Sequence, residues 1–188
     1  VLDNLMAHFS LDTVLADVVV PFLQDLGERW ERGEVAVAQE HFASALLRGR
    51  LLGLARGWGA GLGPLALLAC APGEQHELGL IAFGLALRGR GWRIVYLGPD
   101  TPFESIAEAA RAERPSRVVV SAVDSQALTG GRAALLELAS EHPLAVGGAG
   151  SRGLDLGEDV LVLTDSPIDA ADLITSIERR QRPAARTP

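Results

Sequence analysis

Lysine is the first absence in this sequence, because all 17 basic residues of the 188-residue chain are arginine. A Walker-type P-loop needs a Lys to bind nucleotide phosphates, and a pyridoxal enzyme needs a Lys to form its Schiff base. Two-component receiver domains also use a Lys beside their acidic pocket. The composition alone therefore excludes these three kinds of site.

Cysteine is nearly as scarce, with Cys70 as its single representative. One thiol cannot form an internal disulfide, and it favours a reducing compartment. No apolar run reaches the roughly 18–20 residues of a membrane span, and no signal peptide is visible, so we expect a cytoplasmic chain without membrane contact. The net charge of −7 argues against a nucleic-acid interface, which would present a basic face.

Hydrophobic residues are plentiful, at 48% of the chain, which predicts a folded core. Residues 1–58 follow helical patterns, and we expect them to form a four-helix bundle that acts as a cap. Ser10 is a suitable N-cap, and Asp12 in the first turn suits the helix dipole. Pro21 should kink or interrupt the same helix.

The stretch WERGEVAVAQEH, residues 30–41, places an acid and an imidazole side by side on a helix. Spacing of i, i+4 and i+7 puts Val37, His41 and Ser44 on one helix face, with Glu40 beside them. Two interpretations are open: Glu40 and His41 are ordinary solvated residues, or this face covers a ligand.

The pattern changes after GAGLGP, residues 59–64, which we interpret as a linker. Short apolar runs then alternate with helical patterns, which predicts a doubly wound parallel α/β sheet, flavodoxin-like or Rossmann-like, across residues 65–180. Strands are expected at 65–71, 93–98, 117–123, 144–148 and 160–164, and helices at 77–90, 102–114, 131–141 and 167–180. The tail, 181–188, is expected to be disordered.

Ligands of such a sheet bind at the carboxyl ends of the strands, and the first loop there, PGEQHELG, contains His76. A neutral imidazole can bind a metal through one nitrogen when an acceptor holds its other N–H. Glu74, two residues earlier, is a candidate for that acceptor. Gly79 removes a side chain where the next helix would crowd a bulky ligand.

One histidine with one supporting acid is not a metal cage. A zinc site needs three or four protein ligands, and the other histidines, His8, His41 and His142, show no Cys/His cluster spacing. Any metal that His76 binds must therefore bring its own equatorial ligands, as the metal of a macrocycle does.

The ordered set Glu-x-His-x-x-Gly, Ser-x-Val and Gly-Gly resembles the cobalamin-binding fold, with its Asp-x-His-x-x-Gly, Ser-x-Leu and Gly-Gly motifs. The resemblance implies that His76 is the lower axial ligand of cobalt and that Glu74 orients it. It also implies that Ser121 hydrogen-bonds the nucleotide tail, and that Gly147 and Gly148 line the tail's slot. The neighbouring loop positions expected to contact the cofactor are Gln75, Glu77, Leu78, Gly79, Val123 and Ser125.

The motif Trp-x9-Glu-His in the helical half is similar to that of the CarH/LitR-type adenosylcobalamin photoreceptors. The resemblance implies that Trp30, Val37, Glu40 and His41 shape the pocket of the adenosyl group. It further implies a light sensor, not an enzyme, that binds adenosylcobalamin base-off and His-on. Light would cleave the Co–C bond and change a homo-oligomer, and the signal would pass to a partner or output domain.

Two departures from that family are visible. The MerR-type DNA-binding domain has no counterpart in these residues, so we expect no DNA contact from this chain itself. The family's light-state upper ligand, a His directly after the Trp, is replaced by Glu31, and His41 is one candidate substitute. A bilin such as biliverdin is a further cofactor option in non-covalent form, since Cys70 lies in a predicted buried strand.

Other interpretations stay open at this point. The layout also fits a corrinoid carrier subunit of a cobalamin-dependent methyltransferase or mutase, or a flavodoxin-like module without B12. His76 could be a plain loop histidine, Ser121 a strand end, and Gly147–Gly148 an ordinary turn.

Overall fold

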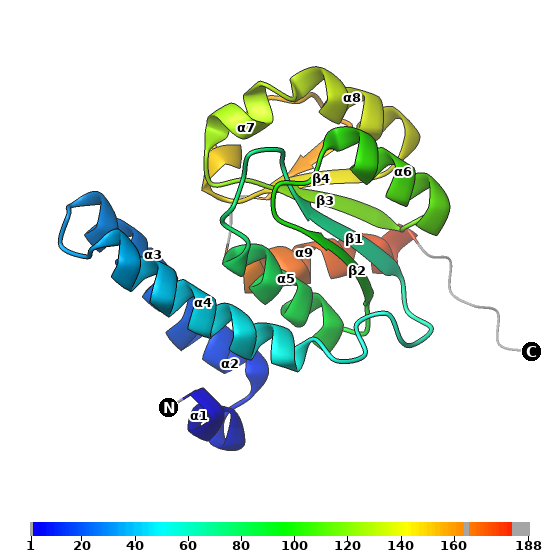
Figure 1. The fold of residues 1–188 in the computed structure, drawn as a ribbon. Coiled ribbons are helices and arrows are strands. Elements are labelled where there is room, and N and C mark those ends of the chain that lie inside the picture. The colour runs from blue at the N-terminus through cyan, green and yellow to red at the C-terminus, as the bar shows by residue number, and fades with distance from the viewer. Residues whose placement is uncertain (1, 164–165, 182–188) are drawn as a thin grey trace, which may run out of the picture.

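The core of the protein is a five-stranded parallel sheet with the strand order β2-β1-β3-β4-β5. The computed structural model describes residues 2–163 and 166–181 (Figure 1). The strands are β1 (Leu65–Cys70), β2 (Arg93–Gly98), β3 (Arg117–Ser121), β4 (Leu144–Gly147) and β5 (Val160–Val162). The strand order reverses between β1 and β3, so the carboxyl ends of these two strands form the topological switch point where ligands bind in such sheets.

Helices cover both faces of the sheet (Figure 1). On one face lie α5 (Leu78–Gly89) and α9 (Pro167–Gln181), and on the other lie α6 (Phe103–Glu113), α7 (Ser125–Thr129) and α8 (Arg132–Glu141). The short 3-10 turn η2 (Ala149–Ser151) follows β4. Strand β1 is buried throughout because its side chains alternate between the two layers: Leu68 and Cys70 pack with the first layer, Leu67 and Ala69 with the second.

The helical cap consists of α1 (Leu2–His8), α2 (Leu11–Val14), the π segment η1 (Leu15–Val19), α3 (Val20–Glu31) and α4 (Val37–Leu54). Ser10 caps α2, as expected, and accepts a hydrogen bond from the Thr13 N–H at 3.1 Å. The interruption expected at Pro21 is the π segment directly before α3, where a wider turn accommodates the missing N–H. Since η1 joins α2 to α3, the four α-helices of the cap lie along three axes.

The cap packs against the α/β part through its base. Val14, Leu15, Val19 and Leu51 are buried in the same apolar cluster as residues of α5 and α9. The hairpin of α3 and α4 extends away from this base and from the sheet (Figure 1). The cap is therefore fixed at one end and projects at the other.

The expected fold class, a helical cap before a doubly wound parallel α/β sheet, is confirmed. The third strand was expected to reach residue 123, but it ends at Ser121, and the following loop contains the unexpected helix α7. The reason is local, because the Asp124 carboxylate accepts the Gln126 N–H at 2.8 Å and caps α7. The expected disordered tail lies outside the described residues, apart from Gln181, which ends α9.

None of the described helices combines the length and the apolar character that crossing a membrane requires.

Candidate functional site

The centre of the candidate site is the buried carboxylate of Glu74, in the loop after β1. Its Oε1 atom accepts the His76 backbone N–H at 2.7 Å and lies 2.6 Å from His76 Nδ1. Its Oε2 atom accepts the backbone N–H groups of Val123 at 2.6 Å and Asp124 at 3.1 Å. One side chain thus joins the loops that follow β1 and β3, at the switch point of the sheet.

Glu74 is charged despite its burial. Desolvation alone would raise the pKa of this carboxyl, but the N–H donors of His76, Val123 and Asp124 favour the anion, and the His76 side chain adds to them. These hydrogen bonds outweigh the burial and hold the pKa of Glu74 below its usual value.

His76 is oriented by that carboxylate. Because Nδ1 lies against Glu74 Oε1, it carries the proton, and Nε2 keeps its lone pair. The His76 side chain is 70% exposed, whereas that of Glu74 is 2% exposed. The imidazole therefore presents a free nitrogen to the space beyond the sheet, from a fixed support, which is the arrangement of a metal ligand with its supporting acceptor.

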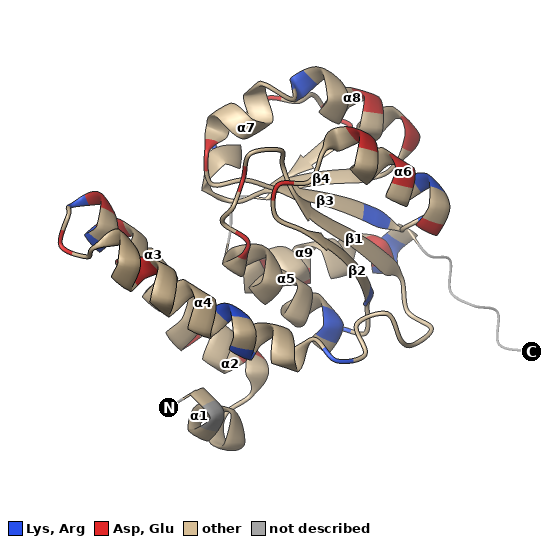
Figure 2. Ribbon diagram, in the orientation of Figure 1, with Lys and Arg blue, Asp and Glu red and all other residues tan. Residues whose placement is uncertain are grey.

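The loop after β2 is tied into the same structure. Asp100 Oδ1 accepts the Gly73 N–H at 2.7 Å, and the Asp100 N–H donates to the carbonyl of Glu74 at 2.8 Å. Figure 2 shows acidic positions in the loops after β1 and β2, on either side of this junction. The support of His76 is thus built from three loops, of which sequence reasoning identified two.

Glu77, a predicted contact of the cofactor, is buried at the junction with the cap. Its Oε1 atom accepts Arg48 Nε of α4 at 2.5 Å, and its Oε2 atom accepts the hydroxyl of Tyr96 on β2. Burial, and next the Glu77 carboxylate, raise the pKa of Tyr96, so the phenol is the donor. Sequence reasoning missed Arg48 and Tyr96, although Arg48 follows His41 at i+7 on the same helix face.

The cap contributes a second histidine that is held by an acid. Glu40 Oε2 lies 2.7 Å from His41 Nδ1, and Glu40 Oε1 accepts the hydroxyl of Ser44 at 2.5 Å. The Ser44 hydrogen bond, and after it the contact with His41, lower the pKa of Glu40. The His41 imidazole is thus held by an acid, as the His76 imidazole is.

The other predicted residues of the cap are exposed. Trp30 is 48% exposed and Val37 is 56% exposed, and neither belongs to the apolar core. The two helix ends that carry them face the same turn, between α3 and α4. Large apolar side chains at this position leave surface that a bound group could cover.

The predicted tail slot lies after β3 and β4. Ser121 is buried at the end of β3, and a Cβ on Gly148 would lie 3.1 Å from its hydroxyl oxygen. Gly148 has a φ of +87°, and a Cβ there would lie 2.3 Å from the carbonyl oxygen of Ala122. Gly147 is less constrained, since the nearest atom to a Cβ would be in Leu163, at 3.6 Å. Gly148 is the residue that lets these two loops approach each other.

The remaining predicted positions differ in their surroundings. Gln75 is exposed, Leu78 packs partly against the core, and a Cβ on Gly79 would contact nothing within 4 Å. The chain itself therefore does not require glycine at 79. Val123 is 48% exposed, and Ser125 is the first residue of α7 rather than part of an open loop.

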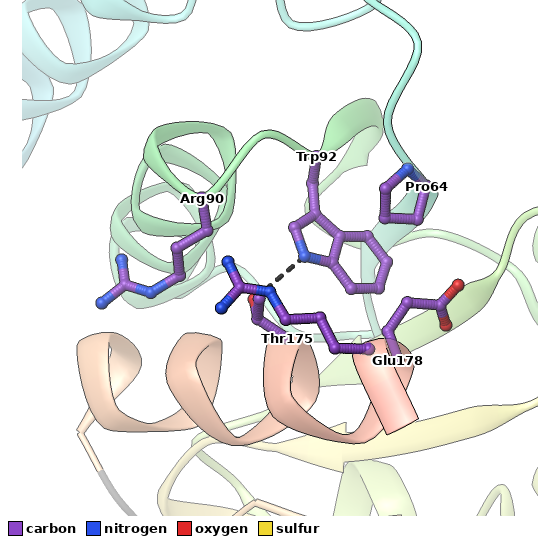
Figure 3. Close-up of a pocket in the computed structure, with 6 residues that line it drawn as sticks. Pro64, Arg90, Trp92, Thr175 and Glu178 are labelled. Atoms are coloured by element: carbon purple, nitrogen blue, oxygen red, sulfur yellow. Dashed lines mark hydrogen bonds between the residues drawn. The ribbon is translucent and has the colours of Figure 1, made fainter. Parts of the chain in front are cut away.

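Two hollows lie in the α/β part. One, of about 440 Å³, opens at the carboxyl edge, next to Pro72 of the β1 loop, and its wall includes Phe103 and Gln126. The other, of about 160 Å³, lies at the opposite edge, where Trp92 Nε1 donates to Thr175 Oγ1 at 3.0 Å (Figure 3). The second crevice lies between α9 and the turn that joins α5 to β2, at the edge of the sheet opposite to His76.

Comparison with known families gives two matches that together cover most of the chain. Residues 64–180 match a family model described as "B12 binding domain", and residues 1–52 match a second model with the same description.

Curated relatives include two proteins of Myxococcus xanthus. The HTH-type transcriptional repressor CarH is 38% identical over 156 residues, which are 81% of this chain and 52% of the relative. The HTH-type transcriptional repressor CarA is 36% identical over the same shares. The chain thus spans about half the length of these relatives.

Solved structures with the same fold include corrinoid proteins. The monomethylamine corrinoid protein of Methanosarcina barkeri is 20% identical, with a TM-score of 0.69 over 93% of this chain and 87% of that chain. A cobalamin-binding protein from Desulfitobacterium hafniense DCB-2 is 24% identical, with a TM-score of 0.51 over 95% of this chain and 88% of that chain.

Proposed function

The chain belongs to the B12-binding domain family, and from this membership we propose that it is a B12-dependent light sensor that binds adenosylcobalamin through His76. The observation that carries the proposal is the pair of acid-held histidines, Glu74–His76 in the loop after β1 and Glu40–His41 on α4 of the cap. The first pair fits a metal ligand and the second pair fits a pocket for a polar group on that metal.

The donor set suits a corrinoid. Among residues 2–163 and 166–181 there is no group of three or more His, Cys, Asp or Glu side chains that could hold a bare metal ion. His76 offers one nitrogen, and a macrocycle supplies the equatorial ligands that the chain lacks. Ser121 and the Gly147–Gly148 turn would receive the nucleotide tail, because Ser121 ends β3 next to the turn after β4, where Gly148 leaves no room for a side chain.

Adenosylcobalamin supplies a cobalt–carbon bond that light breaks. The role of the chain is to hold Trp30, Val37, Glu40 and His41 around the adenosyl group in the dark. When that group leaves, these side chains lose the surface that they cover, and the projecting hairpin of α3 and α4 is free to change its position. We propose that the new position alters self-association, which is a local packing change with a global effect.

A regulatory role is favoured over a carrier role by sequence. Identity reaches 38% and 36% with two proteins named as transcriptional repressors, and these matches cover 81% of the chain. DNA contact is not part of the proposal for these residues; the signal would pass to a partner or to a fused output domain. A bilin such as biliverdin could only be non-covalent, because burial raises the pKa of Cys70 to about 12 and leaves it unreactive.

The test is to purify the protein, load it with adenosylcobalamin in the dark and illuminate it with green light. We expect a changed absorption spectrum and a changed elution volume on size exclusion. His76→Ala should abolish His-on coordination and give a base-off spectrum, whereas the neighbouring exposed Gln75→Ala should match the wild type. An unchanged spectrum and an unchanged elution volume after light would refute the light-sensing proposal.

The second candidate is a corrinoid carrier subunit of a methyltransferase or mutase. It is favoured by the fold, since the monomethylamine corrinoid protein of Methanosarcina barkeri superimposes on 93% of this chain. A carrier should bind methylcobalamin selectively and deliver its methyl group to a partner enzyme. A sensor should instead prefer adenosylcobalamin, so competition between the two cobalamins separates the candidates.

A further inference from the structure

The contact between the cap and the His76 loop is concentrated on one carboxylate. Glu77 directly follows His76 and begins α5 as its N-cap residue. Its side chain is 9% exposed, while that of its partner Arg48 is 48% exposed. Arg48 of α4 and Tyr96 of β2 each occupy one of the two carboxylate oxygens. Three elements from separate parts of the chain therefore meet at Glu77.

Arg48 also lies on the face of α4 that carries the predicted pocket residues Val37 and His41. Val37, His41, Ser44 and Arg48 follow one another at spacings of four, three and four residues, which puts them on one side of the helix. The same side that would cover the cofactor thus reaches the loop below it. A shift of α4 that moves His41 must also move Arg48.

Loss of the Arg48 contact would destabilise the buried carboxylate of Glu77. A buried charged group that loses one of its partners is left partly unpaired, which is unfavourable, whereas exposed ion pairs contribute little. The hydroxyl of Tyr96 would remain on the far oxygen and hold Glu77 to the sheet. The backbone at 76–78 and the position of α4 are therefore mechanically joined through Glu77.

We propose that Arg48 is a positioning residue that couples the cap to the proposed cobalt ligand, through the Arg48–Glu77–Tyr96 bridge. A displacement of the cap is transmitted to the His76 loop by this bridge, and a movement of the loop is transmitted to the cap. The inference deepens the proposed function and rests on it for the identity of the ligand. The coupling itself belongs to the protein and can be measured without cobalamin.

A second ion pair between cap and α/β part provides a matched control. Asp12 of α2 lies 3.1 Å from Arg90, the C-cap residue of α5, which also pairs with Asp172 of α9. This contact joins the cap to α5 and α9 but does not touch the β1 loop. Asp12→Asn therefore removes a cap contact and leaves the Glu77 bridge in place.

The experiment is hydrogen–deuterium exchange on the full chain without cobalamin, in wild type, Arg48→Ala, Arg48→Lys, Tyr96→Phe and Asp12→Asn. We expect Arg48→Ala to speed exchange in α4 and in residues 76–81 by about tenfold, the effect of one lost charged hydrogen bond. Arg48→Lys should restore part of the protection, because a cation is retained. Asp12→Asn should speed exchange in α2 and leave residues 76–81 as in the wild type.

Wild-type exchange at residues 76–81 in Arg48→Ala, or an equal change there in Asp12→Asn, would overturn the coupling. Tyr96→Phe provides an independent check if Arg48→Ala folds poorly. It should speed exchange at residues 76–81 and, to a smaller extent, in α4. Loading with adenosylcobalamin then separates the two proposals. Failure to bind it refutes the proposed function, while the exchange result stands on its own.

Discussion

Replacing Glu74 by Gln gives the sharpest test of how the candidate site is built. The two carboxylate oxygens of Glu74 accept from His76 N and Nδ1 on one side, and from Val123 N and Asp124 N on the other. A glutamine amide keeps one acceptor oxygen and turns the other into an NH2 donor. One of the two sides must then face donor against donor.

The magnitude follows from those contacts. Two hydrogen bonds to a charged acceptor are lost, each contributing about 1.5–3 kcal/mol, and removal of a buried charge returns part of this. We expect Glu74→Gln to lower the free energy of unfolding by about 2–4 kcal/mol at pH 7. Gln75→Glu, at the exposed neighbouring position, should change it by less than about 0.5 kcal/mol.

The difference in the free energy of unfolding between wild type and Glu74→Gln should depend on pH with a defined sign. The native pKa of Glu74 lies below its unfolded value of about 4.3. Its stabilisation is therefore complete above that value and is lost as the pH falls through the lower native pKa. Urea unfolding followed by tryptophan fluorescence should show a gap between wild type and Glu74→Gln that is full at pH 7 and narrows below about pH 4. Equal stability at pH 7, or a gap that does not narrow in acid, would refute this account of Glu74.

Two further changes test neighbouring parts of the fold. Gly148→Ala should destabilise the chain by about 2–4 kcal/mol, because the new Cβ would lie 2.3 Å from the carbonyl oxygen of Ala122 at a φ of +87°. The control Gly147→Ala should cost less than about 1 kcal/mol. Equal effects of the two changes in thermal unfolding would contradict the distinction. Trp92→Phe removes the buried hydrogen bond to Thr175 and should lower the urea midpoint by the equivalent of about 2 kcal/mol. The dark absorption spectrum of the cobalamin-loaded protein should stay that of the wild type. A changed spectrum would show that the crevice around Trp92 is linked to the His76 site.

The fold was largely predictable because its signals are strong and regular. Five apolar runs alternate with helical patterns, and the observed strands and the helices α5, α6, α8 and α9 lie within a few residues of the predicted ranges. The segment α7 was missed because five residues cannot display a hydrophobic period, and its N-cap Asp124 is equally typical of a turn. The π segment before Pro21 was anticipated only as an interruption, since the sequence does not specify which kind.

The site was predictable in part. The spacing of Glu74 and His76 predicted the acceptor and its imidazole, and the geometry brings them together. The second half of the Glu74 contacts, to the loop after β3, could not be predicted because it depends on how the strands pair. Arg48 and Tyr96 were missed for the same reason, since long-range contacts leave no local pattern. The roles of the predicted residues toward cobalamin stay predictions.

The two parts of the candidate site, the His76 loop after β1 and the cap hairpin of α3 and α4, are built differently, and this difference bears on how a signal could arise. In the loop after β1, Glu74 has a partner for each oxygen, and hydrogen bonds within the chain itself hold His76. In the cap, Trp30 and Val37 are about half exposed, and the hairpin of α3 and α4 that carries them projects from the body of the protein. A ligand can shift a conformational equilibrium only by binding one state better than another. Under the proposed function, we therefore expect a light-dependent change to begin in the cap, whose exposed apolar surface the adenosyl group would cover and its departure would expose again.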